Sequence, residues 1–85
     1  MRLDKYLKVS RIIKRRVIAK EAVDKGYVLL NNKIAKASSE VNVGDLLKLT
    51  YKNTSKLYQI TNIFEYATEE KAKSMYKELN EDEHW

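Results

Sequence analysis

The side chains best suited to do chemistry in this chain are the cations near its start. From Arg2 to Gly26, nine lysine and arginine residues stand against three acidic ones, a local net charge of +6 in a chain whose total is +5. Ammonium groups bind phosphate as point charges, whereas guanidinium groups hold it with two parallel hydrogen bonds. Such a concentration of cations predicts a nucleic-acid-binding surface. Its members are Arg2, Lys5, Lys8, Arg11, Lys14, Arg15, Arg16, Lys20 and Lys25.

The inventory of reactive side chains argues against catalysis. His84 is the single histidine, there is no cysteine, and the acidic residues are scattered or gathered near the end. No nucleophile with a neighbouring base and no metal cluster can be assembled from these residues. Gly26 and Gly44 are too far apart to form a glycine-rich phosphate loop. We therefore expect a binding protein and not an enzyme, with no cofactor, in which Asp4 is a local partner for a basic neighbour.

Two short helices must position these cations. Leu3, Tyr6 and Leu7 recur at i, i+3 and i+4, which predicts a first helix of two turns with one buried stripe. A second helix is expected to begin near residue 14 or 15. It should end at Gly26, because glycine accepts the left-handed conformation that commonly closes a helix.

Small residues mark the closest contact of the second helix. Its apolar face consists of Ile18, Ala19, Ala22 and Val23. Because alanine lets neighbouring elements approach closely, we expect Ala19 and Ala22 to lie at a tight seam where an added side chain would not fit.

Strand and turn signals follow the two helices. The Asn31-Asn32 pair lies between apolar runs and tolerates positive φ, which predicts a tight hairpin. Helical composition returns near the end, where Thr68 is in position to cap a helix. The expected elements are a hairpin over residues 27–35, strands over 46–51 and 57–63, and a closing helix over 67–80 followed by an acidic tail from Glu81.

These elements predict one α+β domain, with two N-terminal helices packed on a small antiparallel sheet of three to four strands and a C-terminal helix. A chain of 85 residues without cysteine must be stabilised by a single packed core. Its apolar runs are far shorter than the roughly 20 residues that span a bilayer. We therefore expect a cytoplasmic monomer that does not associate with membranes.

Four short segments carry a family resemblance. They are Arg2-Leu3-Asp4-Lys5-Tyr6-Leu7, Arg16 three residues before Ala19, Gly26-Tyr27-Val28 leading to Asn31, and Val43-Gly44-Asp45. Together and in this order they resemble the RNA-binding domain first described in ribosomal small-subunit protein four, the S-four domain. In that family, two helices and a hairpin form an L-shaped unit whose basic helices contact structured RNA. The resemblance implies an S-four-like RNA-binding domain over residues 1–66, completed by a closing helix and acidic tail over 67–85.

The resemblance also implies which residues contact RNA. It carries this role onto Arg2, Lys5, Lys8, Arg15, Arg16 and Lys20. Arg15 stands where many members have a serine or threonine helix cap, which favours one more phosphate contact at this position. The remaining candidates are Ser10, Arg11, Lys14, Lys33, Lys36 and Ser38, although turn and cap hydrogen bonds explain the serines equally well. We interpret Tyr6, Tyr27, Tyr51 and Tyr58 as core or half-buried residues rather than base-stacking platforms.

Within the family, the chain is similar to stand-alone members that act on ribosomes. Its length, its opening residues and Lys36-Ala37-Ser38 after the hairpin resemble ribosome-quality-control factors of the RqcP type. This resemblance implies binding to the large ribosomal subunit carrying a stalled peptidyl-tRNA, with contacts to ribosomal RNA and tRNA. It further implies support for template-free alanine tailing by an RqcH-type partner. Alternatives are a large-subunit recycling factor like heat-shock protein fifteen, another ribosomal-RNA-binding protein, or a protein adaptor that uses an acidic helix over residues 69–83.

Overall fold

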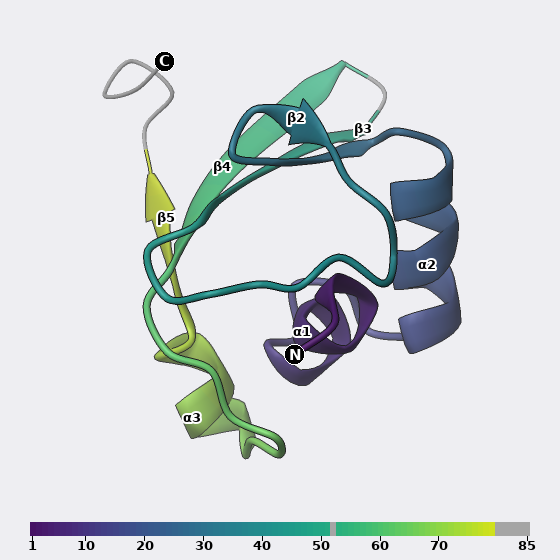
Figure 1. Ribbon diagram of the computed structural model, residues 1–85. Coiled ribbons are helices and arrows are strands. Elements are labelled where there is room, and N and C mark those ends of the chain that lie inside the picture. Colours follow the sequence, from purple (N-terminus) through teal and green to yellow (C-terminus); the bar gives the residue numbers. More distant parts are fainter. Residues whose placement is uncertain (52, 80–85) are drawn as a thin grey trace.

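A computed structural model describes residues 1–51 and 53–79 of the chain (Figure 1). The side chain of Tyr51, and therefore its expected burial, lies outside this description, as do the end of the expected closing helix at Asn80, the acidic tail, His84 and Trp85. The described chain contains three helices and one five-stranded sheet. In chain order these are α1 (Leu3–Val9), α2 (Arg16–Asp24), β1 (Val28–Leu30), β2 (Lys33–Ile34), β3 (Leu46–Tyr51), β4 (Thr54–Ile60), α3 (Glu69–Lys73) and β5 (Tyr76–Leu79).

Both N-terminal helices form where the sequence predicts them. The stripe of Leu3, Tyr6 and Leu7 on α1 is completely buried. Arg11 follows α1 with a positive φ of 64°, a left-handed conformation that stops the helix and turns the chain toward α2. Gly26 closes α2 with a φ of 80°, and its N–H donates to the carbonyl of Val23 (3.0 Å). The predicted glycine stop is confirmed.

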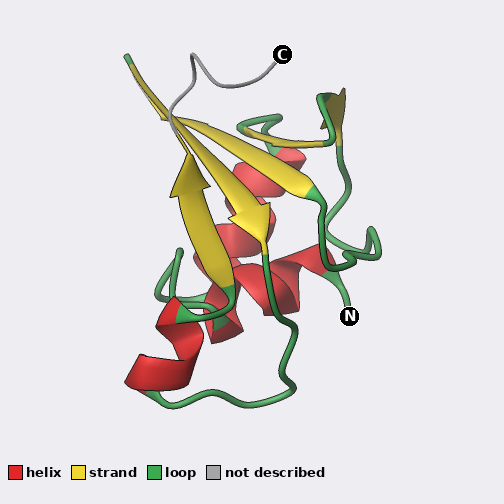
Figure 2. Cartoon of the chain, turned by 90° about the vertical axis from the view of Figure 1, so that its left-hand side faces the viewer, coloured by secondary structure: helices red, strands yellow, loops and turns green. Residues whose placement is uncertain are grey.

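The sheet has the strand order β2-β1-β3-β4-β5, and every neighbouring pair is antiparallel. Helices α1 and α2 lie against one face of this sheet, and α3 lies next to the start of β5 (Figure 2). The buried side chains between the helices and the sheet form a single core, as expected for one α+β domain. Its largest members are Tyr6, Leu3, Leu7, Leu47, Ile60 and Met75.

The turn between β1 and β2 confirms the predicted hairpin. Asn31 and Asn32 both have positive φ, at 51° and 66°, which is the combination that a two-residue type I′ turn requires. Asn31 also secures the hairpin to the start of β3. Its Oδ1 accepts from the N–H of Leu46 (2.9 Å), and its Nδ2 donates to Oδ1 of Asp45 (3.2 Å).

The predicted closing helix over residues 67–80 is wrong beyond its first turns. Thr68 does cap α3 by accepting from the N–H of Lys71 (3.2 Å), but the helix ends at Lys73 and the chain continues as β5. The carbonyl of Met75 explains the ending, because it accepts from the Tyr6 hydroxyl (2.7 Å) and from the N–H of Thr61 (2.9 Å). In a continued helix this carbonyl would accept from the N–H four residues further along, and the two long-range bonds replace that helical bond. The sheet therefore gains a fifth strand beyond the three to four expected.

Tyr6 connects the first helix to the last strand through this bond. Its ring is fully buried and its hydroxyl donates to the Met75 carbonyl, so this buried polar atom has a hydrogen-bond partner. Burial raises the pKa of the Tyr6 phenol well above its usual value of 10.0, with a smaller contribution from nearby Tyr76. The expectation that Tyr6 is a core residue is confirmed.

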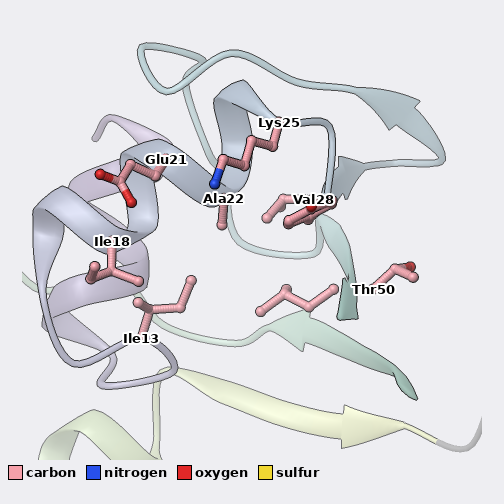
Figure 3. Close-up of a pocket in the computed structure, with 9 residues that line it drawn as sticks. Ile13, Ile18, Glu21, Ala22, Lys25, Val28 and Thr50 are labelled. Carbon is pink, nitrogen blue, oxygen red and sulfur yellow. The ribbon is translucent and has the colours of Figure 1, made fainter. Parts of the chain in front are cut away.

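The two alanines of α2 differ in their surroundings. Ala19 is completely buried. Ala22 is only partly buried and lines a cleft of about 390 Å³ between α2 and strands β1 and β3, beside Ile13, Ile18 and Val28 (Figure 3). The tight seam therefore lies at Ala19 alone, and a larger side chain at Ala22 would meet open space.

This difference predicts effects of different size for the same substitution at two positions. Ala19→Leu should lower the free energy of unfolding by about 1–3 kcal/mol, because the core has no room for three more carbon atoms. Ala22→Leu should change it by less than about 1 kcal/mol, since the new side chain enters the cleft. Chemical denaturation of both variants checks the pair, and equal destabilisation would contradict the packing described here.

Candidate nucleic-acid interface

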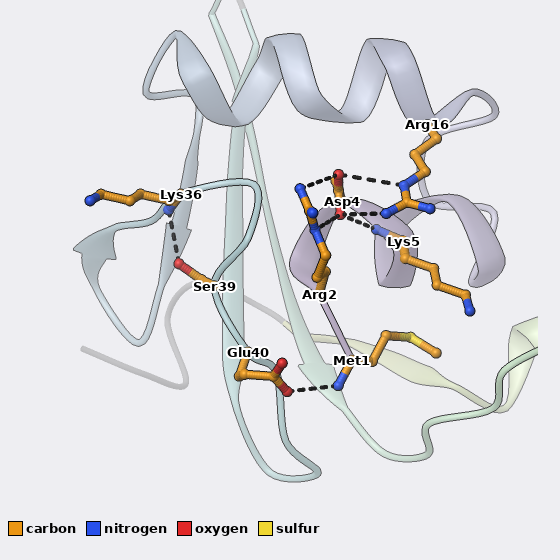
Figure 4. Close-up of polar contacts among 8 residues, drawn as sticks. All are labelled: Met1, Arg2, Asp4, Lys5, Arg16, Lys36, Ser39 and Glu40. Carbon is orange, nitrogen blue, oxygen red and sulfur yellow. Dashed lines mark hydrogen bonds and ion pairs between the residues drawn. The ribbon is translucent and has the colours of Figure 1, made fainter.

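A buried carboxylate organises the surface formed by α1 and α2. Asp4 lies in the first turn of α1 and is only 3% exposed. Its Oδ1 accepts from the N–H of Lys5 (2.8 Å), which satisfies one of the free donors at the helix start. Two guanidinium groups converge on the same carboxylate, from Arg2 just before α1 and from Arg16 at the start of α2 (Figure 4). The expected role of Asp4 as a local partner for basic neighbours is confirmed.

The distances in these ion pairs indicate that Asp4 orients the two guanidinium groups without binding either of them strongly. Arg2 approaches with Nε to Oδ1 at 3.2 Å and Nη2 to Oδ2 at 3.3 Å, and Arg16 with Nε to Oδ2 at 3.4 Å and Nη2 to Oδ1 at 3.5 Å. Strong charge-assisted bonds are shorter, at about 2.7–2.9 Å. Both arginine side chains remain about half exposed, at 49% and 48%. Asp4 therefore fixes two guanidinium groups side by side and leaves part of each open to a phosphate.

The start of α2 adds a second feature that suits an anion. Arg15 occupies the N-cap position with an extended backbone, and no side chain caps the helix there. The first N–H groups of α2 and the positive end of its dipole therefore lie beside the exposed side chains of Lys14, Arg15 and Arg16. Arginine at a helix start is electrostatically unfavourable unless an anion is bound nearby. This arrangement can hold a phosphate group.

The start of α1, in contrast, is closed by the protein itself. The N–H groups of Leu3 and Asp4 donate to the carbonyls of Ser39 (2.8 Å) and Ala37 (3.1 Å). The N-terminal ammonium group pairs with Glu40 at 2.8 Å. The segment over residues 36–41 is thereby tied to α1, so the two helices differ in what they offer to an anion.

The candidate contact residues fall into three groups. The first group consists of exposed cations that lie between Arg2 and the first half of α2. We call it the basic surface, and its members are Arg2, Lys8, Arg11, Lys14, Arg15, Arg16 and Lys20. Lys33, Lys36 and Ser38 are exposed on the hairpin and the following loop. Figure 4 shows Lys36 pointing away from the arginine pair. Lys5 is half-buried and forms an ion pair with Glu65.

Ser10 requires a correction. It is only 1% exposed, and its hydroxyl donates to the carbonyl of Leu7 (3.3 Å) at the end of α1. The side chain therefore helps to end the helix and is not available to a phosphate oxygen. Of the two readings left open for the serines, the helix-end hydrogen bond is the one found at this position.

Two residues of the loop before α3 were missed by the sequence analysis. Glu65 accepts a hydrogen bond from the Lys5 ammonium group, which lowers the pKa of its carboxyl group, and the Coulomb attraction of the same cation adds to this effect. Tyr66 is 87% exposed, and Lys5 Nζ lies 5.6 Å from the centre of its ring. Loop residues carry no periodicity, so nothing in the sequence places them beside α1.

The described residues offer neither a metal site nor a membrane span. Across residues 1–51 and 53–79, no group of three or more acidic or histidine side chains could hold a metal ion. None of the helices in this part of the chain is long and apolar enough to cross a bilayer.

The position of Asp4 predicts that orientation matters more than total charge. Asp4→Asn raises the net positive charge by one, so diffuse attraction to RNA should increase. We expect the opposite: a severalfold weaker affinity for RNA, because Arg2 and Arg16 lose the anion that aligns them. The free energy of unfolding should also fall, by about 1–3 kcal/mol. Filter binding and thermal unfolding measure the two effects.

Asp24→Asn is the matched control for this prediction. It changes the charge by the same amount at an exposed position of α2 that makes no ion pair with any described residue. Its affinity for RNA should stay equal to that of the parent or rise slightly. If Asp4→Asn behaved like this control, the carboxylate would have no orienting role.

The chain matches known proteins over most of its length. The model of the S4 domain family matches residues 1–47. The chain is 43% identical over 81 residues to the RQC P-site tRNA stabilizing factor of Streptococcus pneumoniae, which covers 95% of this chain and 92% of that protein. It is 44% identical over 82 residues to the factor of the same name from Bacillus subtilis, covering 96% of this chain and 95% of that protein.

A solved structure gives the same result for the fold. Heat Shock Protein 15 of Vibrio cholerae, described as a trimer, superposes with a TM-score of 0.85 at 31% identity, covering 93% of this chain and 81% of that chain. The predicted similarity to ribosome-quality-control factors and to heat-shock protein fifteen is therefore confirmed. The matched segment, the relatives and the shared fold together show that this chain belongs to the S4 domain family.

Proposed function

We propose that this chain binds the large ribosomal subunit carrying a stalled peptidyl-tRNA and contacts both ribosomal RNA and tRNA through the basic surface. The observation that carries this proposal is the convergence of Arg2 and Arg16 on buried Asp4, beside the uncapped start of α2. Two fixed guanidinium groups and free helix N–H groups suit the closely spaced phosphates of folded RNA. Sucrose-gradient sedimentation tests the proposal: the protein should migrate with large subunits and not with free small subunits.

The more detailed role is to hold a tRNA in place while a partner extends the nascent chain. The relatives from S. pneumoniae and B. subtilis are named for stabilizing a tRNA in the P site, which supports this reading. Template-free alanine tailing with an RqcH-type partner follows from the resemblance. Such a role places the protein in the cytoplasm with ribosomes. We propose that it acts as a monomer, in contrast to the trimer described for the V. cholerae protein, and light scattering of the purified chain tests this.

The two alternative functions make different demands on the chain. A recycling role like that of heat-shock protein fifteen uses the same RNA-binding surface, so only a tailing assay with and without the protein separates it from the proposed role. A protein adaptor would need an acidic helix. In place of that helix, α3 has five residues in which Glu69 and Glu70 are balanced by Lys71 and Lys73. The charge of α3 therefore gives an adaptor little support, and ribonuclease-resistant pull-down partners would be needed to revive it.

Arg16 should be needed for its shape as well as its charge. A lysine at this position keeps the charge but lacks the planar fork of donors with which guanidinium can hold Asp4 and a phosphate in fixed positions. Arg16→Lys should therefore weaken binding to purified large subunits by about tenfold, the equivalent of one charge-assisted bond. Co-sedimentation of both proteins with subunits measures the ratio.

Lys77→Ala serves as the control because Lys77 is exposed on β5, outside the basic surface. It removes a full charge, yet it should change the affinity less than Arg16→Lys does. A larger loss from Lys77→Ala would move the RNA-binding surface to the other end of the chain.

Salt should weaken binding steeply if the basic surface contacts several phosphates. Each contact releases counterions, so the logarithm of affinity should fall against the logarithm of salt concentration with a slope of roughly −0.7 to −0.9 per contact. Titrations with large subunits between low and physiological salt give this slope. A flat dependence would contradict an electrostatic mechanism.

A further inference from the structure

A second hollow lies at the end of the basic surface. It has a volume of about 210 Å³ and is lined by Lys8 and Val9 from α1, by Arg11 and Lys14 from the α1–α2 connection, and by Tyr66 and Ala67 from the loop before α3. Three cations thus face one aromatic ring. The loop residues lie outside the segment matched by the S4 domain model, which ends at residue 47.

The structure holds the Tyr66 ring in an exposed position. The ring is 87% exposed, so the nearby Lys5 ammonium group covers little of it. Lys5 also pairs with Glu65, which fastens the loop to α1 directly beside the ring. Farther back, Thr61 Oγ1 and Asn62 Nδ2 both donate to the carbonyl of Ser74, at 2.7 and 2.9 Å. These contacts hold the segment that precedes the ring, and the ring itself is left facing solvent.

Arg11, on the opposite side of the hollow, has a strained backbone conformation. Its φ of 64° is unfavourable for a residue with a Cβ atom, and glycine is the usual residue at such a helix end. The chain keeps a long cationic side chain where glycine would be more stable. Strain of this kind at a surface position points to a functional use of the side chain.

We propose that this hollow binds one unstacked nucleotide of the RNA, with the base against the Tyr66 ring and the adjoining phosphates on Lys8, Arg11 and Lys14. This inference rests on the proposed function, because the nucleotide belongs to the same RNA. Unpaired bases stack on exposed aromatic rings, and cations beside the ring bind the backbone. The combination of an exposed aromatic ring and three cations suits a nucleotide better than an acidic peptide, which would leave the ring unused.

Tyrosine substitutions separate stacking from charge. Tyr66→Leu should weaken binding to purified large ribosomal subunits by about tenfold, as expected for the loss of one stacked base. Tyr66→Phe keeps the ring and should stay within about twofold of the parent. The salt slope should be the same for all three proteins, because stacking involves no phosphate contact. Ultraviolet crosslinking of the parent to large subunits should place a nucleotide adduct on the peptide that contains Tyr66.

Arg11→Gly tests the other side of the hollow with two readouts that move in opposite directions. The unfolding temperature should rise, because glycine accepts the left-handed conformation. The magnitude of the salt slope should fall by roughly 0.7–0.9, the contribution of one phosphate contact. If Arg11 contacts no phosphate, Arg11→Gly should still raise the unfolding temperature but should leave the salt slope unchanged. That result would remove Arg11 from the proposed site.

Failure of this inference differs from failure of the proposed function. If the parent binds large subunits and Tyr66→Leu binds them equally well, no base is stacked on the ring and the inference is overturned, while the proposed function stands. If Tyr66→Phe loses as much affinity as Tyr66→Leu, the hydroxyl group and not stacking accounts for the effect, and the inference is again overturned. If the parent itself does not bind large subunits, both proposals fall.

Discussion

The buried carboxylate of Asp4 imposes the main constraint on this protein. An unpaired charge inside a protein is very unfavourable, so Asp4 must be surrounded by donors. It obtains them from its own helix at Lys5 and from two arginines that belong to different parts of the basic surface. The angle between α1 and α2 and the position of the two guanidinium groups are therefore coupled. A change that moves one helix also disturbs the arrangement that would meet phosphate.

Local patterns were sufficient to predict the N-terminal half of the fold. The stripe of Leu3, Tyr6 and Leu7, the glycine after α2 and the Asn-Asn turn each act through neighbouring residues, and all three were found as expected. The closing helix was mispredicted because its fate depends on residues far away. The carbonyl of Met75 is taken by Tyr6 and Thr61, which no local periodicity reveals.

In the candidate site, too, some features could be predicted from local sequence and others depend on long-range contacts. Counting charges located the cations of the basic surface, but the count treated them as equivalent. Only the folded chain distinguishes Arg2 and Arg16, which are aligned by Asp4, from Lys5, which is paired with Glu65. Likewise, the sequence gives no reason to place Tyr66 near Lys8, since 58 positions separate them and the loop carries no pattern. Tertiary contacts decide these points.

The bond from Tyr6 to Met75 also bears on how the protein folds during its own synthesis. The core beneath α1 is completed by a residue near the other end of the described chain, and β5 pairs with β4 only through residues 76–79. Contacts with such long sequence separation form late, because a large loop must close first. A nascent chain that has released only its basic helices would therefore lack the packing that shapes them. The packing that shapes the basic surface should therefore be complete only after β5 has been synthesised.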